Sequence, residues 1–366
     1  MQRLTGWRFT QKLANGLLHL LFSLFVVAVS CWLCLALWIQ MPLGNLFTPL
    51  LIVLWLVFSC VILGIYFSRA FISRPIDFLI FIVGFLLGLA WYFNIQPRQD
   101  RDWNPEVARI LDYQRHGHLV TLNNVRNFRW HQDGTFEQHW QTRHIDLNKI
   151  TGVNMVASYW MGPQIAHTLV SFDFADQQPL VFSLEIRKEK TEDFSAIGGF
   201  FRKYELSLIA ADEQDIIFTR SNVRHEQVYF FPIDMPKQQL QELFLEYLQT
   251  SDRLREQPSW YNTLTSNCTT IVFDMVRAIL QQPFPKDYRI ILSGYLPNYL
   301  YDHHVLDHHW SMQTWYQKAH INPRTANFHQ GVALDGSSLD TSKHPSNFSA
   351  LVRQGLPLNS KNIQAQ

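Results

Sequence analysis

The stretch WYNTLTSNCTTIVFDMVRAIL, residues 260–280, leads from a polar run into a helical pattern and contains one cysteine, Cys268. Beyond Cys268, apolar side chains recur at the three- and four-residue spacing of one helix face. Ser266 or Asn267 is a natural N-cap, so Cys268 should lie in the first helical turn, where backbone N–H groups lack partners. The positive end of the helix dipole favours a thiolate there. We therefore expect Cys268 to be a catalytic nucleophile.

Three apolar stretches precede this region, at residues 17–39, 48–67 and 76–93. Each has close to the roughly 20 residues that a helix needs to cross a bilayer. Three buried core helices are the alternative, but soluble core helices are rarely so long or so free of charge. We expect residues 1–95 to form a membrane domain with three transmembrane helices.

The basic residues near these stretches predict an orientation. The arm before the first span carries three Lys or Arg residues and the loop 68–75 carries two, whereas the loop 40–47 carries none. Because cytoplasmic loops are enriched in Lys and Arg, the N-terminus should be cytoplasmic. After three spans, residues 96–366 should lie outside. We expect a multi-pass membrane protein whose soluble part is periplasmic or extracellular.

The net charge of +1 conceals an asymmetry between the two parts. Residues 1–95 carry five Lys or Arg and one acid, Asp77, whereas the remainder carries 26 basic and 29 acidic residues. The soluble part lacks a cluster of basic residues, and contacts with phosphate dominate the affinity of nucleic-acid binders. We therefore expect no nucleic-acid partner.

The compartment changes how the cysteines are interpreted. Cys31, Cys34 and Cys60 belong to the predicted spans, so Cys268 has no cysteine partner within the soluble part. An unpaired thiol in an oxidising compartment is a liability unless it is buried or used. A functional thiol, a buried inert thiol and an intermolecular disulfide all remain open at this point.

Residues 167–174 and 180–187 alternate in polarity and predict a β-hairpin. If both apolar faces are buried together, even positions must pair with even ones, and a five-residue bend around Asp176 then sets His167 across from Glu185. An imidazole oriented by a carboxylate is the arrangement of a general base. Asp173 could orient His167 instead, and a solvated histidine without a catalytic role is the simpler alternative.

The remaining soluble sequence predicts an antiparallel sheet packed with helices, an α+β fold. We expect an amphipathic helix at 236–254, a short helix at 106–113, a connection at 146–160 and strands at 118–122, 125–132, 136–143, 204–210, 216–220 and 227–231. His304 and His308, in the histidine cluster 302–309, have the helical spacing of metal ligands, but the paired acid of an H-E-x-x-H motif is absent and no cysteine lies nearby. We expect no metal and no cofactor.

Several motifs of the soluble part resemble the Lnb-type periplasmic domain family. They are Val125-Arg-Asn-Phe128, Arg143-His-Ile-Asp-Leu147, Ser158-Tyr-Trp160, Ala166-His-Thr-Leu-Val-Ser-Phe172, Ser183-Leu-Glu-Ile-Arg-Lys188, Phe201-Arg-Lys-Tyr-Glu-Leu206, Asp212-Glu-Gln-Asp215 and Tyr261-Asn-Thr-Leu-Thr-Ser-Asn-Cys-Thr-Thr270. The resemblance covers roughly residues 103–300 in consistent order. It leaves the apolar stretches and the C-terminal tail less well covered.

The resemblance implies a circularly permuted papain-like, NlpC-type cysteine domain, for which we expect residues 96–310, followed by a polar extension, 311–366, that wraps the surface or frays. Such domains include thiol hydrolases and acyltransferases, and the Lnb proteins that give the family its name are bacterial lipoprotein N-acyltransferases. Carried over, Cys268 is the nucleophile, His167 the base and Glu185 the third member. Asn267 and Thr269 would support the oxyanion from the first helical turn.

The expected function is that of a membrane-anchored periplasmic thiol acyltransferase or hydrolase that works through a thioester. Its expected partners are inner-membrane lipid, a phospholipid acyl donor and a lipoprotein acceptor. A cell-wall peptide peptidase or amidase would use the same residues. A non-catalytic membrane-anchored binding domain is the third interpretation.

Overall fold

The computed structural model describes residues 2–68, 74–131, 133–279, 284–328, 330 and 347–357. The chain divides into two compact units, one of residues 1–97 with 195–203 and one of residues 98–194 with 204–366. Arg69 of the predicted cytoplasmic loop lies outside the described residues, as do residues 329, 331–346 and 358–366 of the predicted C-terminal extension. Each unit is considered by itself below.

The first unit contains the three predicted apolar helices, α1 (Gln2–Gln40), α2 (Gly44–Ser68) and α3 (Arg74–Asn94). Their segments 13–40, 44–68 and 75–94 are long and apolar enough to cross a membrane. Polar side chains pair between helices, since Ser30 Oγ lies 2.9 Å from Ser59 Oγ and His19 Nδ1 lies 2.9 Å from the hydroxyl of Tyr66. Such pairs satisfy polar groups that lipid would leave without partners.

A loop from later in the chain, residues 195–203, also belongs to this unit and includes the short helix η3 (Gly198–Phe200). Gln40 at the end of α1 donates to the carbonyls of Phe201 and Arg202 at 2.5 and 2.8 Å. The Arg202 guanidinium donates to the carbonyls of Tyr92, Phe93 and Ile95. These bonds satisfy carbonyl groups that the end of a helix leaves without partners, so the loop caps α3.

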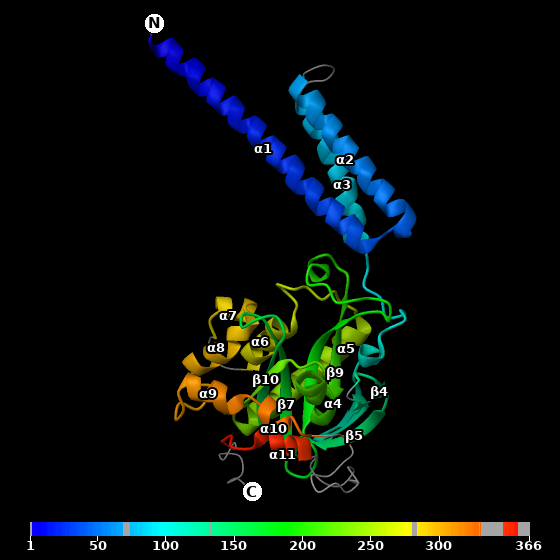
Figure 1. Cartoon of the computed structure of the whole chain (residues 1–366), viewed down its shortest axis with the longest axis vertical. Helices are drawn as coiled ribbons and strands as arrows, with labels where there is room; N and C mark the ends of the chain where they lie inside the picture. The colour runs from blue at the N-terminus through cyan, green and yellow to red at the C-terminus, as the bar shows by residue number, and fades with distance from the viewer. Residues whose placement is uncertain are drawn as a thin grey trace. The chain divides into compact units, whose positions relative to one another are not determined.

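The second unit is built on an eight-stranded sheet in the order β1-β2-β9-β8-β7-β6-β10, with β5 paired to β2 (Figure 1). Neighbouring strands are antiparallel except for a single parallel bridge between β2 and β9. The strands are β1 (Asp112–His116), β2 (Leu119–Arg126), β5 (Trp140–Asp146), β6 (Ile150–Tyr159), β7 (Ala166–Phe174), β8 (Leu180–Arg187), β9 (Glu205–Ala211) and β10 (Gln227–Ile233); β3 (Arg129–Trp130) and β4 (Phe136–Glu137) pair separately.

Helices cover both faces of the sheet. On one face, Phe244 and Tyr247 of α5 (Lys237–Glu256) pack against Phe182 of β8, and α6 (Cys268–Ile279) contacts β7 and β8. On the other face, Glu213 of α4 (Glu213–Phe218) accepts a hydrogen bond from Ser171 of β7. The predicted α+β class and the amphipathic helix at 236–254 are therefore confirmed.

Two predicted segments, one strand and one connection, were wrong in type. The segment 216–220 is helical, in α4 and the π-helical turn η4 (Thr219–Val223), because its short apolar run fits either element. Residues 150–159, expected to be a connection, form the inner strand β6, where Asn154 is buried and hydrogen-bonds to Asp173. With helices on both faces, polar residues inside a strand need such partners, and strict alternation is lost.

Two smaller predictions also differ from the structure. The pair Asn123-Asn124, which separates the predicted strands 118–122 and 125–132, is a bulge within a single strand, β2, where Asn124 adopts φ 62°. The segment 106–113, predicted to be a short helix, is helical only at its start. Asn104 caps the single turn η1 (Pro105–Val107), and the chain enters β1 at Asp112.

The described part of the C-terminal tail packs into the core instead of fraying. Trp315, Phe328 and Phe348 are buried in the same cluster as the sheet. Their apolar side chains are sparse among polar neighbours, which conceals them in the sequence. The helices after α6 are α7 (Tyr288–Ile291), η5 (Ser293–Tyr295), α8 (Leu296–Asp302), α9 (Met312–Ala319), α10 (Asn322–Thr325) and α11 (Asn347–Arg353).

Candidate active site

Cys268 is the first residue of α6, as the capping pattern predicts. The side-chain oxygen of Asn267 accepts hydrogen bonds from the N–H groups of Thr269 and Thr270, both at 2.9 Å. This is the N-cap geometry that satisfies otherwise unpaired donors of a first turn. Cys268 is a free, buried thiol with 7% of its surface exposed. The helix therefore begins at the thiol and fixes its position.

His167 and Glu185 meet across the β7–β8 pair. Leu169 pairs with Ser183 at the end of the ladder, and the same register carried two residues further sets His167 across from Glu185, as predicted. The distance from His167 Nε2 to Glu185 Oε1 is 3.1 Å. The Ser183 hydroxyl accepts from His167 Nε2 and donates to Glu185 Oε1, both at 2.7 Å. Both contacts use Nε2 of His167, and the Cys268 thiol is a further hydrogen-bonding partner of the imidazole.

Glu185 belongs to a buried charge network that the sequence did not predict. Arg220 of η4 donates to Glu185 at 2.8 Å and to Glu226 at 3.2 Å, and Ser158 of β6 also donates to Glu226. Two carboxylates thus share one guanidinium, which leaves one negative charge without compensation. A protonated His167 supplies the missing positive charge, so the network favours the imidazolium.

The pKa of the Cys268 thiol is lowered and the pKa of the His167 imidazole is raised. Both shifts favour a thiolate–imidazolium ion pair. Burial alone would lower the pKa of His167, but Glu185 outweighs it and raises the pKa to about 9. Burial alone would raise the pKa of the Cys268 thiol, but the charge of His167 lowers it, helped by hydrogen bonds from His167, the Thr168 N–H and the Thr269 side chain. Burial would also raise the pKa of Glu185, but His167 and Arg220 hold it well below its usual range.

The structure therefore brings Cys268, His167 and Glu185 together, and it places Asp173 elsewhere. Asp173 is on the same strand as His167, near its opposite end. Its carboxylate accepts hydrogen bonds from Asn154 and Arg353. Of the two acids that the sequence left open as the partner of the histidine, Glu185 is the one in contact with it.

Asn267 and Thr269 support the site in a different way from the one expected. Because the Thr269 N–H is bonded to Asn267, it has no spare proton for an oxyanion. Its hydroxyl instead bonds to that of Thr168 at 2.9 Å and so joins α6 to β7. Within the described residues, the N–H of Cys268 itself has no hydrogen-bond acceptor, and it is the donor of the first turn left for an oxyanion.

Ser183, Arg220, Glu226 and Thr168 are the neighbours of the site that sequence reasoning missed. Ser183 lies two residues before Glu185 on the same strand and therefore on the same face, so the hairpin pattern could have predicted its contact with the site. Arg220 and Glu226 had none, because the segment around them was assigned to a strand and their contacts span distant parts of the chain.

Within the described residues, no group of three or more His, Cys, Asp or Glu side chains could hold a metal ion. The rings of His304 and His308 stack at 4.3 Å, and His308 Nε2 donates to the carbonyl of Tyr301 at 2.7 Å. The histidine cluster therefore includes an exposed turn in which the rings of His304 and His308 stack on each other.

Residues 136–294 match the family model of the Lnb N-terminal periplasmic domain. This segment contains Cys268, His167 and Glu185, and it bears out the resemblance seen in the sequence motifs. No curated protein and no solved structure matches the chain. With the three candidate spans, the match indicates a membrane-anchored protein with a periplasmic domain.

Proposed function

We propose that this protein is a thiol acyltransferase or hydrolase that forms an acyl thioester at Cys268. The observation that carries the proposal is the contact of a helix-capped thiol with a histidine that is itself oriented by a buried carboxylate. A nucleophile, a base and a group that orients the base are the recurring elements of covalent acyl transfer.

In the proposed reaction, His167 holds the proton of Cys268, and the thiolate attacks the carbonyl carbon of an acyl ester. The Cys268 N–H stabilises the resulting oxyanion. The ester C–O bond breaks, the alcohol leaves with the proton from His167, and a thioester remains. An amine or a water molecule then gives a proton to His167 and attacks the thioester. When the thiolate leaves, the histidine either returns this proton to it or keeps the proton, which restores the resting ion pair.

The proposed substrates are a membrane lipid as acyl donor and a lipoprotein as acceptor. The support is the three candidate spans, which tether the domain to a bilayer where both substrates would be concentrated. The match to the Lnb domain family agrees with this assignment. A cell-wall peptide amidase would use the same three residues, and the orientation with the soluble unit in the periplasm remains part of the proposal.

The test is mass spectrometry of lipoprotein N-termini from cells that lack the protein, express it, or express Cys268→Ser. We expect N-acylated termini with the wild-type chain and a return to the level of the deletion strain with Cys268→Ser. A Cys60→Ser variant is the matched control, because it replaces a cysteine within an apolar helix. Equal N-acylation in all strains would contradict the transferase assignment.

A further inference from the structure

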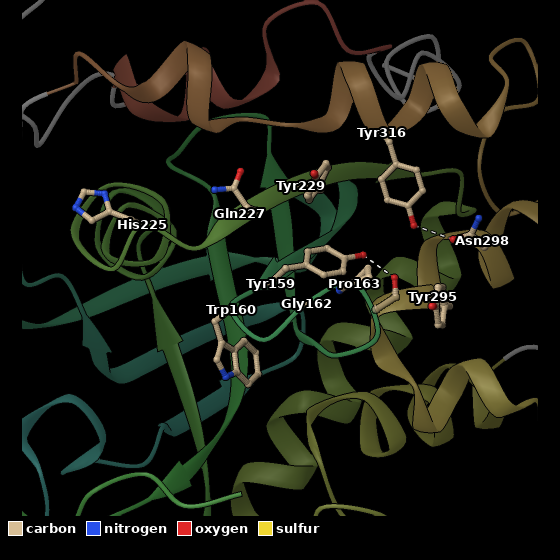
Figure 2. A pocket seen from close by; sticks show the side chains of 11 residues that line it. Tyr159, Trp160, Gly162, Pro163, His225, Gln227, Tyr229, Tyr295, Asn298 and Tyr316 are labelled. Atoms are coloured by element: carbon tan, nitrogen blue, oxygen red, sulfur yellow. Dashed lines mark hydrogen bonds between the residues drawn. The ribbon is translucent and has the colours of Figure 1, made fainter.

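A second candidate site lies at the edge of the sheet, where β6 pairs with the edge strand β10. It is an open pocket of about 690 Å³, within the range typical of ligand-binding pockets. Figure 2 shows its aromatic side chains, which come from β6, β10, η5 and α9. The lining residues are Tyr159, Trp160, Gly162, Pro163, His225, Gln227, Tyr229, Gly294, Tyr295, Asn298 and Tyr316. None of them belongs to the proposed catalytic group.

Strand pairing places part of this lining on one face. Gln227 of β10 is opposite Tyr159 of β6, and Tyr229 is two residues further along the same strand. Residues in register across antiparallel strands point to the same side of the sheet. The Tyr159 hydroxyl donates to the carbonyl of Gly294 at 2.6 Å, which holds the ring in place.

The two amide side chains of the pocket each have their acceptor occupied. The Tyr316 hydroxyl donates to Asn298 Oδ1 at 2.7 Å, and His320 Nε2 donates to Gln227 Oε1 at 3.0 Å. Within the described residues, neither amide NH₂ group has an acceptor, and the hydroxyls of Tyr229 and Tyr295 have no hydrogen bond. The pocket thus offers unused donors between aromatic rings.

The pocket also lacks fixed charge, since no Asp, Glu, Lys or Arg is among its lining residues. Burial lowers the pKa of the neighbouring His320, which therefore stays neutral at neutral pH. A charged ligand would lose hydration without gaining an ion pair. An alkyl chain would cover the NH₂ and hydroxyl groups without bonding them, at a cost of about 1–3 kcal/mol for each buried group.

We propose that this pocket binds a neutral pyranose oligosaccharide. A sugar ring presents C–H groups on one face, which pack on aromatic rings, and hydroxyl and acetamido oxygens at its edge, which accept from amide NH₂ groups. The pocket therefore gives the protein a glycan-binding site beyond the proposed thiol chemistry. The pocket is linked to the strand that carries His167. Ser293, next to the lining residue Gly294, hydrogen-bonds to both the N–H and the carbonyl of Ala166, which precedes His167.

The test is isothermal titration calorimetry of the full-length protein with tri-N-acetylchitotriose and with maltotriose. The detergent must have no sugar headgroup, so lauryldimethylamine oxide is suitable. We expect saturable binding of at least one trisaccharide. Trp160→Ala should weaken the binding of the trisaccharide by about tenfold or more, because the pocket loses an aromatic ring on which the sugar would pack. Tyr288→Ala, which removes an exposed aromatic side chain outside the pocket, is the matched control and should bind normally.

No binding of either sugar would overturn the proposal, as would unchanged binding by Trp160→Ala. Saturable binding of sodium octanoate without a sugar response would also overturn it and would identify an alkyl pocket. Iodoacetamide labelling of Cys268 in the same samples separates this result from the proposed function. A reactive thiol without sugar binding would contradict the glycan site alone.

Discussion

At the scale of residues, the site is governed by the balance of charge around His167. Glu185 and Glu226 share Arg220, and the resulting surplus of negative charge is opposite the imidazole. The cost of burying these charges is offset only while every partner is present. The same network that holds His167 protonated lowers the pKa of the Cys268 thiol.

Replacing His167 with alanine should slow the alkylation of Cys268 by iodoacetamide at pH 7. The thiol then loses the positive charge and keeps the burial that raises its pKa, and each unit of increase cuts the thiolate fraction about tenfold. We expect a loss of about tenfold or more, measured in a chain whose other three cysteines are serine. His131→Ala, at an exposed histidine, is the control. An unchanged rate in His167→Ala would rule out the proposed ion pair.

Glu185→Gln should change how stability depends on pH. The pKa of His167 is raised to about 9, so the imidazolium stabilises the fold fully below pH 6.5 and loses this contribution as the pH rises through 9. The pKa of Glu185 is lowered, so its contribution is present above pH 4.5 and is lost as the pH falls through the lower folded value. Both contributions are complete between about pH 4.5 and 6.5.

In that window, Glu185→Gln should destabilise the second unit by about 3–5 kcal/mol, because Arg220 and His167 lose their shared partner. Thermal unfolding of the full chain at pH 6 and at pH 10 measures the difference, which should shrink at the higher pH. Glu256→Gln, at an exposed carboxylate, should be neutral at both. A loss for Glu185→Gln that is the same at the two pH values would refute the proposed coupling.

How much of the site could be predicted depended on the range of the interactions. The thiol at the helix start follows from local capping, and the His167–Glu185 pair follows from the parity and the bend length of one hairpin. Arg220, by contrast, reaches Glu185 from a π-helical turn 35 residues away in sequence, and no local pattern specifies that contact. The roles of the three residues in catalysis stay predictions.

At the scale of elements, the connection between η5 and the β6–β7 turn holds the base in place. Gly294 lies so close to this turn that an added Cβ would come within 2.1 Å of the Pro163 carbonyl oxygen. The neighbouring Ser293 bonds to both backbone groups of Ala166. Only glycine permits this approach, and the approach places η5 against the strand that carries His167.

Gly294→Ala should therefore shift η5 away from β7, destabilise the second unit by about 1–3 kcal/mol and slow Cys268 alkylation. Thermal unfolding and the iodoacetamide rate measure the two effects. Gly64→Ala in α2 is the matched control, because no atom lies within 4 Å of its added Cβ. A Gly294→Ala protein with wild-type stability and reactivity would show that this close approach is unimportant.

Elements were predicted well where the sequence pattern was clearly periodic and poorly where it was short or did not alternate, as at residues 216–218 and in β6. The helix α5 shows clear periodicity because it is amphipathic. The inner strand β6 does not alternate, since eight of its ten residues are buried. The short run Ile216-Ile-Phe218 fits a helix or a strand equally well, and tertiary packing selected the helix.

At the scale of the whole molecule, a candidate membrane anchor is followed by an α+β unit with a buried thiol centre. The three spans and the fold class were predictable because long apolar runs and strand periodicity are strong signals. The assignment of residues 195–203 to the first unit was not, because it depends on hydrogen bonds between segments more than 100 residues apart.

The most direct measurement of the central claim is the intact mass of the full-length protein after incubation with a phospholipid that carries a fluorescent acyl chain. The chain should have Cys268 as its single cysteine, and Cys268→Ala is the control. We predict one acyl group on Cys268 that neutral hydroxylamine releases, and none on Cys268→Ala. Absence of the adduct from a chain whose Cys268 still alkylates rapidly, or equal acylation of Cys268→Ala, would contradict the account.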